Sequence, residues 1–193
     1  MKALEQAILT QGRGIGSDIV KVDMFLNHRI DVALSTQMGQ AFYEAFKDDG
    51  VDVILTVEAS GIAIAITTAQ AFGSIPVVFG KKGDHSNVGS DVFTAPVFSF
   101  THQKLNHIRV SRKYLEPGQR VLIIDDFLAN GEAIRGLMDI IKQAGCECVG
   151  AGICVEKGFQ PGGKELREAG LKVVSLAIVE SIDDGKITLR EQG

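Results

Sequence analysis

The sequence is poor in cysteine, which limits both disulfide and metal chemistry. Its 193 residues include three cysteines, Cys146, Cys148 and Cys154. Cys146 and Cys148 are two residues apart on an expected strand, a poor arrangement for a disulfide. No histidine or second cysteine pair lies nearby in the sequence, which disfavours a metal site. We therefore expect three reduced thiols, as in a cytoplasmic protein.

The sequence also lacks long apolar runs and an excess of positive charge. It begins Met-Lys-Ala-Leu-Glu-Gln, without the apolar run of a signal peptide, and no segment approaches the roughly 20 apolar residues of a membrane span. The net charge of −4 argues against nucleic acid as a bulk partner. An anionic substrate would then need a local basic patch, for which the candidates are Lys81, Lys82, Arg109, Arg112 and Lys113.

Apolar patterning predicts an α/β fold in one domain that spans residues 1–193. We find no repeat, low-complexity segment or linker, and the length suits a single core. Helices are expected over residues 2–11, 31–48, 62–72, from about 131 to 145, and 161–169. Buried strands are expected over residues 51–57, 75–79, 121–124, 148–155 and 173–179. This alternation predicts a mainly parallel sheet with helices on both faces.

The stretch 121–133 carries the main candidate site. Four apolar residues form a buried strand, and Asp125 and Asp126 follow where that strand is expected to leave the sheet. The loop after them leads through Gly131 into a helix whose apolar face holds Ile134, Leu137, Met138 and Ile141. Ligands of open α/β sheets bind at the carboxyl ends of the strands, and a helix N-terminus suits a phosphate. Acids for hydroxyls beside a phosphate loop indicate a sugar-phosphate site.

Three further segments resemble ligand-binding loops at strand ends. Glu58-Ala-Ser-Gly61 follows a buried strand and precedes a helix. This position fits either a phosphate-binding loop or a plain turn. Lys81 and Lys82 follow another strand, so at least one of them is expected to face an anionic ligand. Lys157 and Phe159 follow the strand 148–155, where an ammonium group and a ring suit an oxo-purine. A surface lysine beside a half-buried phenylalanine explains that pair equally well.

Four segments together resemble one family of enzymes. The Asp125–Asp126 motif resembles the phosphoribosyl pyrophosphate (PRPP) motif of type I phosphoribosyltransferases. The segments 20–31, 58–62 and 156–161, which read VKVDMFLNHRID, EASGI and EKGFQP, are similar to the xanthine phosphoribosyltransferase branch from end to end. Most of the superfamily carries Thr-Gly-x-Thr in its phosphate loop, whereas this chain has Ala-Asn-Gly-Glu-Ala over residues 129–133. That loop resembles the xanthine branch, and it leaves phosphate binding to backbone donors and Asn130.

The resemblance implies a function and a set of site residues. It implies transfer of a 5-phosphoribosyl group from PRPP to xanthine in purine salvage, giving xanthosine 5′-monophosphate and pyrophosphate, with Mg²⁺ held mainly by PRPP and water near the two acids. The implied catalytic residues are Asp125 and Asp126. The implied PRPP-binding residues are Ala129, Asn130, Gly131, Glu132, Ala133, Ser60, Gly61, Lys81 and Lys82. The implied xanthine-binding residues are Val20, Asn27, Lys157 and Phe159.

The resemblance also implies an architecture. A small hood over the purine is expected from about residues 1–30 and the C-terminal segment, although residues 20–27 alone also fit an edge strand with Phe25 and Leu26 packed inward. A flexible β flap is expected within residues 84–110, where His85, His102 and His107 receive no role. A cytoplasmic homodimer with no nucleic-acid or membrane partner is expected.

Three other functions fit the sequence less well. Residues 12–16 contain three glycines but lack the Gly-x-Gly-x-x-Gly spacing and the preceding strand of a dinucleotide site, so a flexible turn is expected there. A purine-responsive repressor of this fold carries an added N-terminal DNA-binding domain, whereas this chain reaches its hood segment within some two dozen residues. A phospho-acceptor receiver domain has paired aspartates after its first strand, whereas the pair here lies after the middle of the chain.

Overall fold

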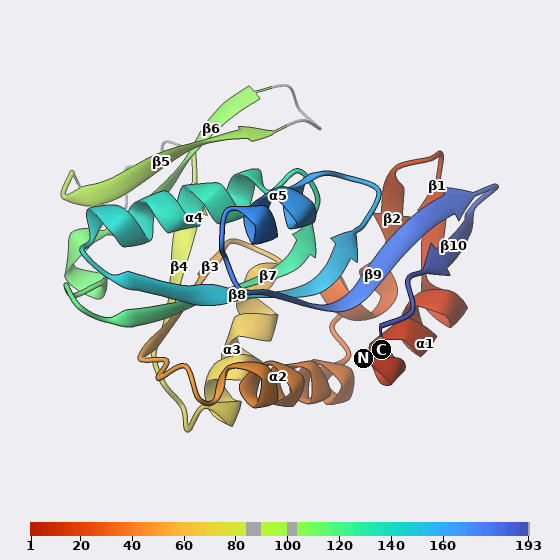
Figure 1. Cartoon of the computed structure of the whole chain (residues 1–193), viewed down its shortest axis with the longest axis horizontal. Coiled ribbons are helices and arrows are strands. Elements are labelled where there is room, and N and C mark those ends of the chain that lie inside the picture. Colours follow the sequence, from red (N-terminus) through yellow and green to blue (C-terminus); the bar gives the residue numbers. More distant parts are fainter. Residues whose placement is uncertain (84–89, 100–103, 193) are drawn as a thin grey trace.

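The structure is a computed structural model that describes residues 1–83, 90–99 and 104–192. Its centre is an eight-stranded sheet with the strand order β10-β9-β8-β7-β3-β4-β6-β5 (Figure 1). Strands β9, β8, β7, β3 and β4 are parallel to one another, and antiparallel strands extend the sheet at both edges. The strands are β3 (Val53–Val57), β4 (Val77–Lys82), β5 (Val92–Ser99), β6 (Lys104–Ser111), β7 (Arg120–Leu128), β8 (Glu147–Lys157), β9 (Val173–Asp183) and β10 (Lys186–Leu189). The predicted α/β fold is confirmed, with a sheet that is parallel at its centre and mixed overall.

Helices cover both faces of this sheet (Figure 1). Helices α2 (Val32–Phe46) and α3 (Gly61–Ala71) pack on one face, and α4 (Glu132–Gln143) and α5 (Gly162–Glu168) pack on the other. Side chains of β7 alternate between two apolar clusters: Leu122 and Ile124 belong to one, and Val121 and Ile123 to the other. This burial on both faces is what the uninterrupted apolar run predicted.

Helix α2 forms as its sequence predicts. Asp31 caps it, because the Asp31 carboxylate accepts a hydrogen bond from the backbone N–H of Leu34 at 3.0 Å. Four apolar side chains spaced four residues apart turn one face of the helix into the core, and all of them are buried: Leu34, Met38, Phe42 and Phe46. The helix ends two residues earlier than expected.

The N-terminal segment differs from expectation in two places. Helix α1 (Lys2–Gln11) has the expected bounds and buries Leu4 and Ile8, whereas Leu9 is 56% exposed. Gly14 lies on the short strand β1 (Arg13–Ile15), which pairs in antiparallel register with β2 (Ile19–Lys21), so the expected turn is found only at Gly16 and the residues after it. A π-helical turn (Asp23–Asn27) follows, so the edge-strand interpretation is wrong beyond β2, although Phe25 and Leu26 are buried as expected.

Two strands extend further than their apolar runs. Strand β7 includes Asp125 and Asp126, because β8 continues beside it and pairs through Leu128 and Glu156. Strand β4 includes both lysines for the same reason, since β6 pairs with it at Lys81 and Lys82. The prediction that these four polar residues follow their strands is therefore wrong. They lie in the last residues of the strands, where polar side chains of adjacent strands can meet.

The expected hairpin within residues 84–110 is confirmed as β5 and β6, whose antiparallel register sets Val92 opposite Ser111 and Ser99 opposite Lys104. His107 lies on β6, whereas His85 and His102 lie outside the described residues. A 3₁₀ turn (Arg112–Tyr114) follows the hairpin. The flexibility of the β5–β6 hairpin as a flap stays a prediction.

All three cysteines are free thiols, and burial raises the pKa of each of them, so none is activated as a nucleophile. Within the described part of the chain, none of the helices combines the length and apolar character needed to span a bilayer.

Candidate active site

A pocket of about 670 Å³ opens where β4, β7 and β8 end. The phosphate loop predicted from the sequence forms one wall, and Lys82 and Lys157 reach the pocket from β4 and β8. The hairpin β5–β6 contributes another wall. The lining residues are Asp18, Ile19, Lys82, Val97, Phe98, Asn106, Ile108, Phe127, Leu128, Ala129, Asn130, Gly131, Glu132, Ala133, Ile134, Lys157 and Gln160.

The phosphate loop, residues 129–133, turns from β7 into α4 at Gly131. That residue has φ of +84°, a left-handed conformation that favours glycine. The loop is fixed from outside, because Arg135 donates to the carbonyl oxygen of Asn130 at 2.6 Å and also contacts the carboxylates of Glu132, at 3.2 Å, and Glu165. The contact with Arg135 balances the negative charge of Glu132 within a loop that is expected to hold an anion.

Helix α5 supports this loop. The backbone N–H of Gly162 donates to the carbonyl oxygen of Ala129 at 3.1 Å, and the ion pair between Arg135 and Glu165 joins the first turns of α4 and α5. Helix α5 follows the candidate purine contacts Lys157 and Phe159 in the chain, and it therefore holds their segment and the phosphate loop together.

Asp125 and Asp126 are both buried at the end of β7, with exposed fractions of 5% and 7%. The Asp125 carboxylate accepts from the backbone N–H of Asp126 at 3.0 Å, and the Asp126 carboxylate accepts from the amide Nδ2 of Asn27 at 3.2 Å. Burial raises the pKa of Asp125 well above its ordinary value of 3.8, and the neighbouring charge of Asp126 acts in the same direction. A buried acid with a raised pKa, two residues before the pocket-lining Phe127, is typical of a functional site.

The second predicted loop lies against the acids. A methyl group built on Gly61 would lie 2.1 Å from Thr56 Oγ1 and 3.2 Å from Asp125 Oδ1, so this position has room only for glycine. Thr56 Oγ1 is buried without a hydrogen-bond partner within the described residues. Glu58 accepts from the backbone N–H of Lys82 at 2.7 Å, which joins this loop to the end of β4.

Lys157 approaches the pocket from the end of β8. Its ammonium group donates to the backbone carbonyl of Asp18 at 2.7 Å, which ties β8 to the turn between β1 and β2. Burial lowers the pKa of Lys157 below its ordinary value, and the charge of Asp18 only partly opposes this effect. A partly desolvated ammonium group suits recognition of a carbonyl oxygen.

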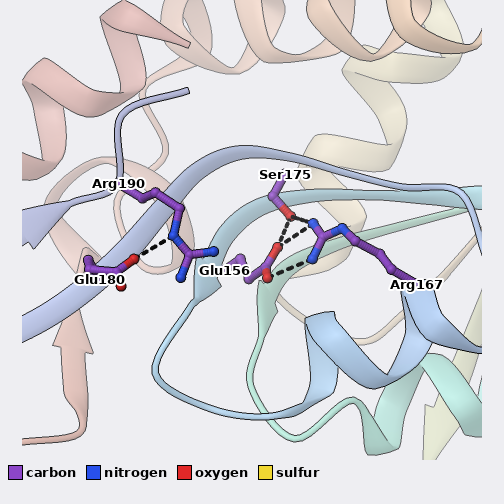
Figure 2. A network of polar contacts seen from close by, with 5 residues as sticks. All are labelled: Glu156, Arg167, Ser175, Glu180 and Arg190. Carbon is purple, nitrogen blue, oxygen red and sulfur yellow. Dashed lines mark hydrogen bonds and ion pairs between the residues drawn. The ribbon is translucent and has the colours of Figure 1, made fainter. Parts of the chain in front are cut away.

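Glu156, the residue before Lys157, forms an ion pair with Arg167 (Figure 2). Glu156 accepts from Arg167 of α5 at 2.9 and 2.7 Å, and from the hydroxyl of Ser175 on β9. Burial alone would raise the pKa of Glu156. The hydrogen bonds from Arg167 and Ser175 and the charges of Arg167 and Arg190 outweigh it and lower that pKa. Arg190 itself pairs with Glu180 beside this group (Figure 2).

The structure brings together most, but not all, of the residues predicted from the sequence. The loop 129–133, Lys82 and Lys157 line one pocket, Asn27 contacts Asp126, and Gly61 lies close to Asp125. Lys81 neighbours Lys82 on a strand, where successive side chains point to opposite faces. Val20 is buried in the core cluster on the α2 side, Ser60 precedes α3, and Phe159 is 37% exposed beyond β8.

Sequence reasoning missed Asp18 and Gln160. Asp18 lines the pocket through a turn that no local pattern marked as functional. Gln160 lies within the quoted segment 156–161, and its side-chain Oε1 is buried without a hydrogen-bond partner within the described residues. The available signal was its position between Phe159 and Pro161, the residue that precedes α5.

The donors present fit a magnesium ion that is held mostly by a substrate. Asp125 and Asp126 supply carboxylates, and Mg²⁺ in phosphate-binding sites takes one or two carboxylates together with phosphate oxygens and water. Within residues 1–83, 90–99 and 104–192, no cluster of three or more histidine, cysteine or acidic side chains has the geometry of a protein-only metal site. The two acids are therefore the residues that would face such an ion.

Comparisons with known proteins agree with this geometry. A family model described as a phosphoribosyl transferase domain matches residues 22–184. The chain is 52% identical over 187 residues to "Xanthine phosphoribosyltransferase" of Laribacter hongkongensis, which covers 97% of this chain and 98% of that protein. It is 50% identical over 190 residues to the protein of the same name from Clostridioides difficile, covering 98% and 100%.

Solved structures share the fold at low sequence identity. The adenine phosphoribosyltransferase of Rhodothermus marinus matches with a TM-score of 0.72 and 21% identity, covering 92% of this chain and 99% of that one. The adenine phosphoribosyltransferase of Saccharomyces cerevisiae matches with a TM-score of 0.73 and 18% identity, covering 91% and 99%.

Proposed function

Because this chain belongs to the phosphoribosyl transferase domain family, we propose that it transfers the 5-phosphoribosyl group of PRPP to xanthine. The products are xanthosine 5′-monophosphate and pyrophosphate, and the reaction serves purine salvage. Membership in the family confirms the type I phosphoribosyltransferase fold that the sequence predicted. The relatives named above as xanthine phosphoribosyltransferases support xanthine as the acceptor.

One observation carries the proposal: the phosphate loop and the two lysines Lys82 and Lys157 line the same pocket. In the bound state the 5′-phosphate lies on the backbone N–H groups of residues 129–133, with Asn130 as a side-chain donor. Lys82 faces pyrophosphate, for which Ser60 and Gly61 supply further contacts and Lys81 is the alternative lysine. Lys157 reads the oxygen at position six of the purine, and Phe159 stacks on its ring.

The chemistry is a displacement at the anomeric carbon of ribose. A bond forms from a purine ring nitrogen to this carbon, the bond from the carbon to pyrophosphate breaks, and the ring nitrogen releases its proton. The transition state has oxocarbenium character, which the negative charge of the acid pair stabilises while Asp125 and Asp126 orient the ribose hydroxyls. When Mg²⁺ is bound, it would neutralise charge on the pyrophosphate, and the two acids would face the water molecules around the ion.

Base recognition is assigned to the hood. Xanthine, guanine and hypoxanthine share an oxygen at position six, so Lys157 does not discriminate between them. They differ at position two, which bears a carbonyl, an amino group or hydrogen. Asn27 offers an amide to this position, and the backbone near Val20 completes the contact. The hydrogen bond from Asn27 to Asp126 supports its place at the active site.

The same proposal covers the organisation of the enzyme. The whole chain is one domain, with a hood built from about residues 1–30 and the C-terminal segment. The hydrogen bond from the N–H of Gly14 to the carbonyl of Gly185, at 3.1 Å, supports this pairing of the two ends. We further propose a cytoplasmic homodimer. Sedimentation at micromolar concentration that shows only active monomers would contradict it.

The test is an initial-rate assay of pyrophosphate release with PRPP and Mg²⁺. Xanthine, guanine and hypoxanthine are each supplied as the acceptor, and the nucleotide product is identified by mass. We expect the highest kcat/KM with xanthine, and xanthosine 5′-monophosphate as its product. Asp125→Asn serves as the matched variant with a low rate on all three bases. Failure to release pyrophosphate with any purine would refute the proposed function.

A further inference from the structure

A hydrogen bond joins the base-reading residue to a catalytic acid. Asn27 ends the π-helical turn Asp23–Asn27, and its Nδ2 donates to Oδ2 of Asp126 at 3.2 Å, across 99 residues of sequence. Asp126 is buried at the end of β7, and Asn27, which is itself exposed, directly follows the fully buried Leu26. The contact therefore spans the base site and the ribose site.

This bond changes what an asparagine can recognise. A primary amide donates from its nitrogen and accepts at its oxygen, and it exchanges the two by a half-turn. An unrestrained asparagine could thus donate to the carbonyl of xanthine or accept from the amino group of guanine. A carboxylate only accepts, so a half-turn of Asn27 would bring two acceptors together and leave Asp126 without its donor.

We propose that Asp126 is a specificity-determining residue, which holds the amide of Asn27 in the orientation that donates to the purine. One N–H of Nδ2 is held by Asp126, and the second N–H is offered to the carbonyl at position two of xanthine. Guanine presents an amino group there, and two donors then face each other. This inference rests on the proposed function, and it assigns Asp126 a role in base choice besides its contact with ribose.

Asp125 provides a matched control within the same motif. It is the same residue type, equally buried and adjacent in sequence, but its Oδ1 accepts from the backbone N–H of Asp126. Changing either acid to asparagine removes one ionisable carboxyl group from the ribose site. Only Asp126→Asn replaces the acceptor that faces Asn27 by an amide, which can accept or donate and so allows both orientations of Asn27.

The experiment measures the ratio of kcat/KM for xanthine to that for guanine. The proteins compared are the wild type, Asp126→Asn, Asp125→Asn, Asn27→Ala and the double variant Asn27→Ala with Asp126→Asn. We expect Asp126→Asn to narrow the ratio on the order of tenfold, since Asn27 is then free to turn and accept from the amino group of guanine. Asp125→Asn should slow both bases and leave the ratio within about twofold of wild type. In the Asn27→Ala background, Asp126→Asn should leave the ratio unchanged.

A second measurement covers a variant whose turnover is too slow to resolve. The ratio of the Kd values for xanthosine and guanosine 5′-monophosphates, obtained by calorimetry, reports the same discrimination without chemistry. An unaltered ratio in Asp126→Asn, or an equal shift in Asp125→Asn, would overturn the inference. So would a shift that persists in the Asn27→Ala background. A wild type that does not use xanthine at all would instead refute the proposed function, which separates the two failures.

Discussion

Replacing Arg167 by methionine should destabilise the protein in a pH-dependent way. Arg167 donates two hydrogen bonds to Glu156, whose side chain is 4% exposed, and methionine keeps most of the volume without the charge. The variant leaves a buried carboxylate with the hydroxyl of Ser175 as its remaining partner. The perturbation therefore exposes the cost of an unpaired buried charge.

The magnitude follows from the burial of the two partners. Removing one member of a fully buried ion pair costs about 3–5 kcal/mol. Arg167 is 37% exposed, so water screens the pair, and we expect a loss of about 2 kcal/mol in the free energy of unfolding near pH 7. Arg190→Met is the matched control. Its partner Glu180 is half-exposed, so the loss should stay below about 1 kcal/mol.

The sign of the pH dependence is fixed by the pKa of Glu156. In the wild type that pKa lies below its ordinary value of 4.5, so the ion pair stabilises the fold above this pH and is lost as the pH falls through the folded-state pKa. In Arg167→Met, burial without the guanidinium raises the pKa of Glu156, and the carboxylate is neutralised in mild acid. The stability difference between the two proteins should therefore be largest near pH 7 and shrink towards about pH 4.

The assay is urea unfolding of wild type, Arg167→Met and Arg190→Met near pH 7 and pH 4. Adding Glu156→Gln to Arg167→Met should restore most of the lost stability, because a neutral amide is buried at lower cost. Equal losses in the two arginine variants would refute this reasoning. A loss from Arg167→Met that is the same at both pH values would refute it as well.

Three further outcomes are expected. Gly61→Ala should cost about 1–3 kcal/mol of stability, since its methyl group would overlap Thr56 Oγ1, and Thr56→Ala should recover part of this in thermal melts; no recovery would place the clash elsewhere. Asp125→Asn should reduce turnover on the order of tenfold to a hundredfold but change the melting temperature little, because burial already disfavours the Asp125 charge; a collapse in melting temperature with normal turnover would make the acid structural. The rate of wild type should fall more between neutral and alkaline pH than the rate of Lys157→Arg, because burial lowers the pKa of Lys157 whereas arginine stays charged. Parallel pH profiles of the two proteins would contradict this.

Local patterns predicted the elements that carry the site. Helix α2 could be predicted because its cap, Asp31, and its apolar face are both encoded within a few turns of sequence. The phosphate loop could be predicted because a buried run, two acids and Gly131 stand in order along the chain. Each of these signals depends on neighbours in the sequence.

Contacts between distant segments could not be predicted in this way. The bond between Asn27 and Asp126, and that between Lys157 and Asp18, depend on how the N-terminal segment packs against the ends of β7 and β8. Apolar periodicity also places a strand end where the apolar residues stop, whereas pairing with a longer neighbour carries β7 through Asp126 to Leu128. The apolar pattern of one segment specifies neither its contacts with distant segments nor the length of the strand that pairs with it.

A crystal structure with bound xanthosine 5′-monophosphate tests the central claim most directly. We expect the 5′-phosphate on the backbone N–H groups of residues 129–133 and the ribose hydroxyls at Asp125 and Asp126. We also expect the oxygens at positions six and two within hydrogen-bond distance of Lys157 and Asn27. A nucleotide with its phosphate away from this loop, or with its purine outside the reach of both side chains, would contradict the account.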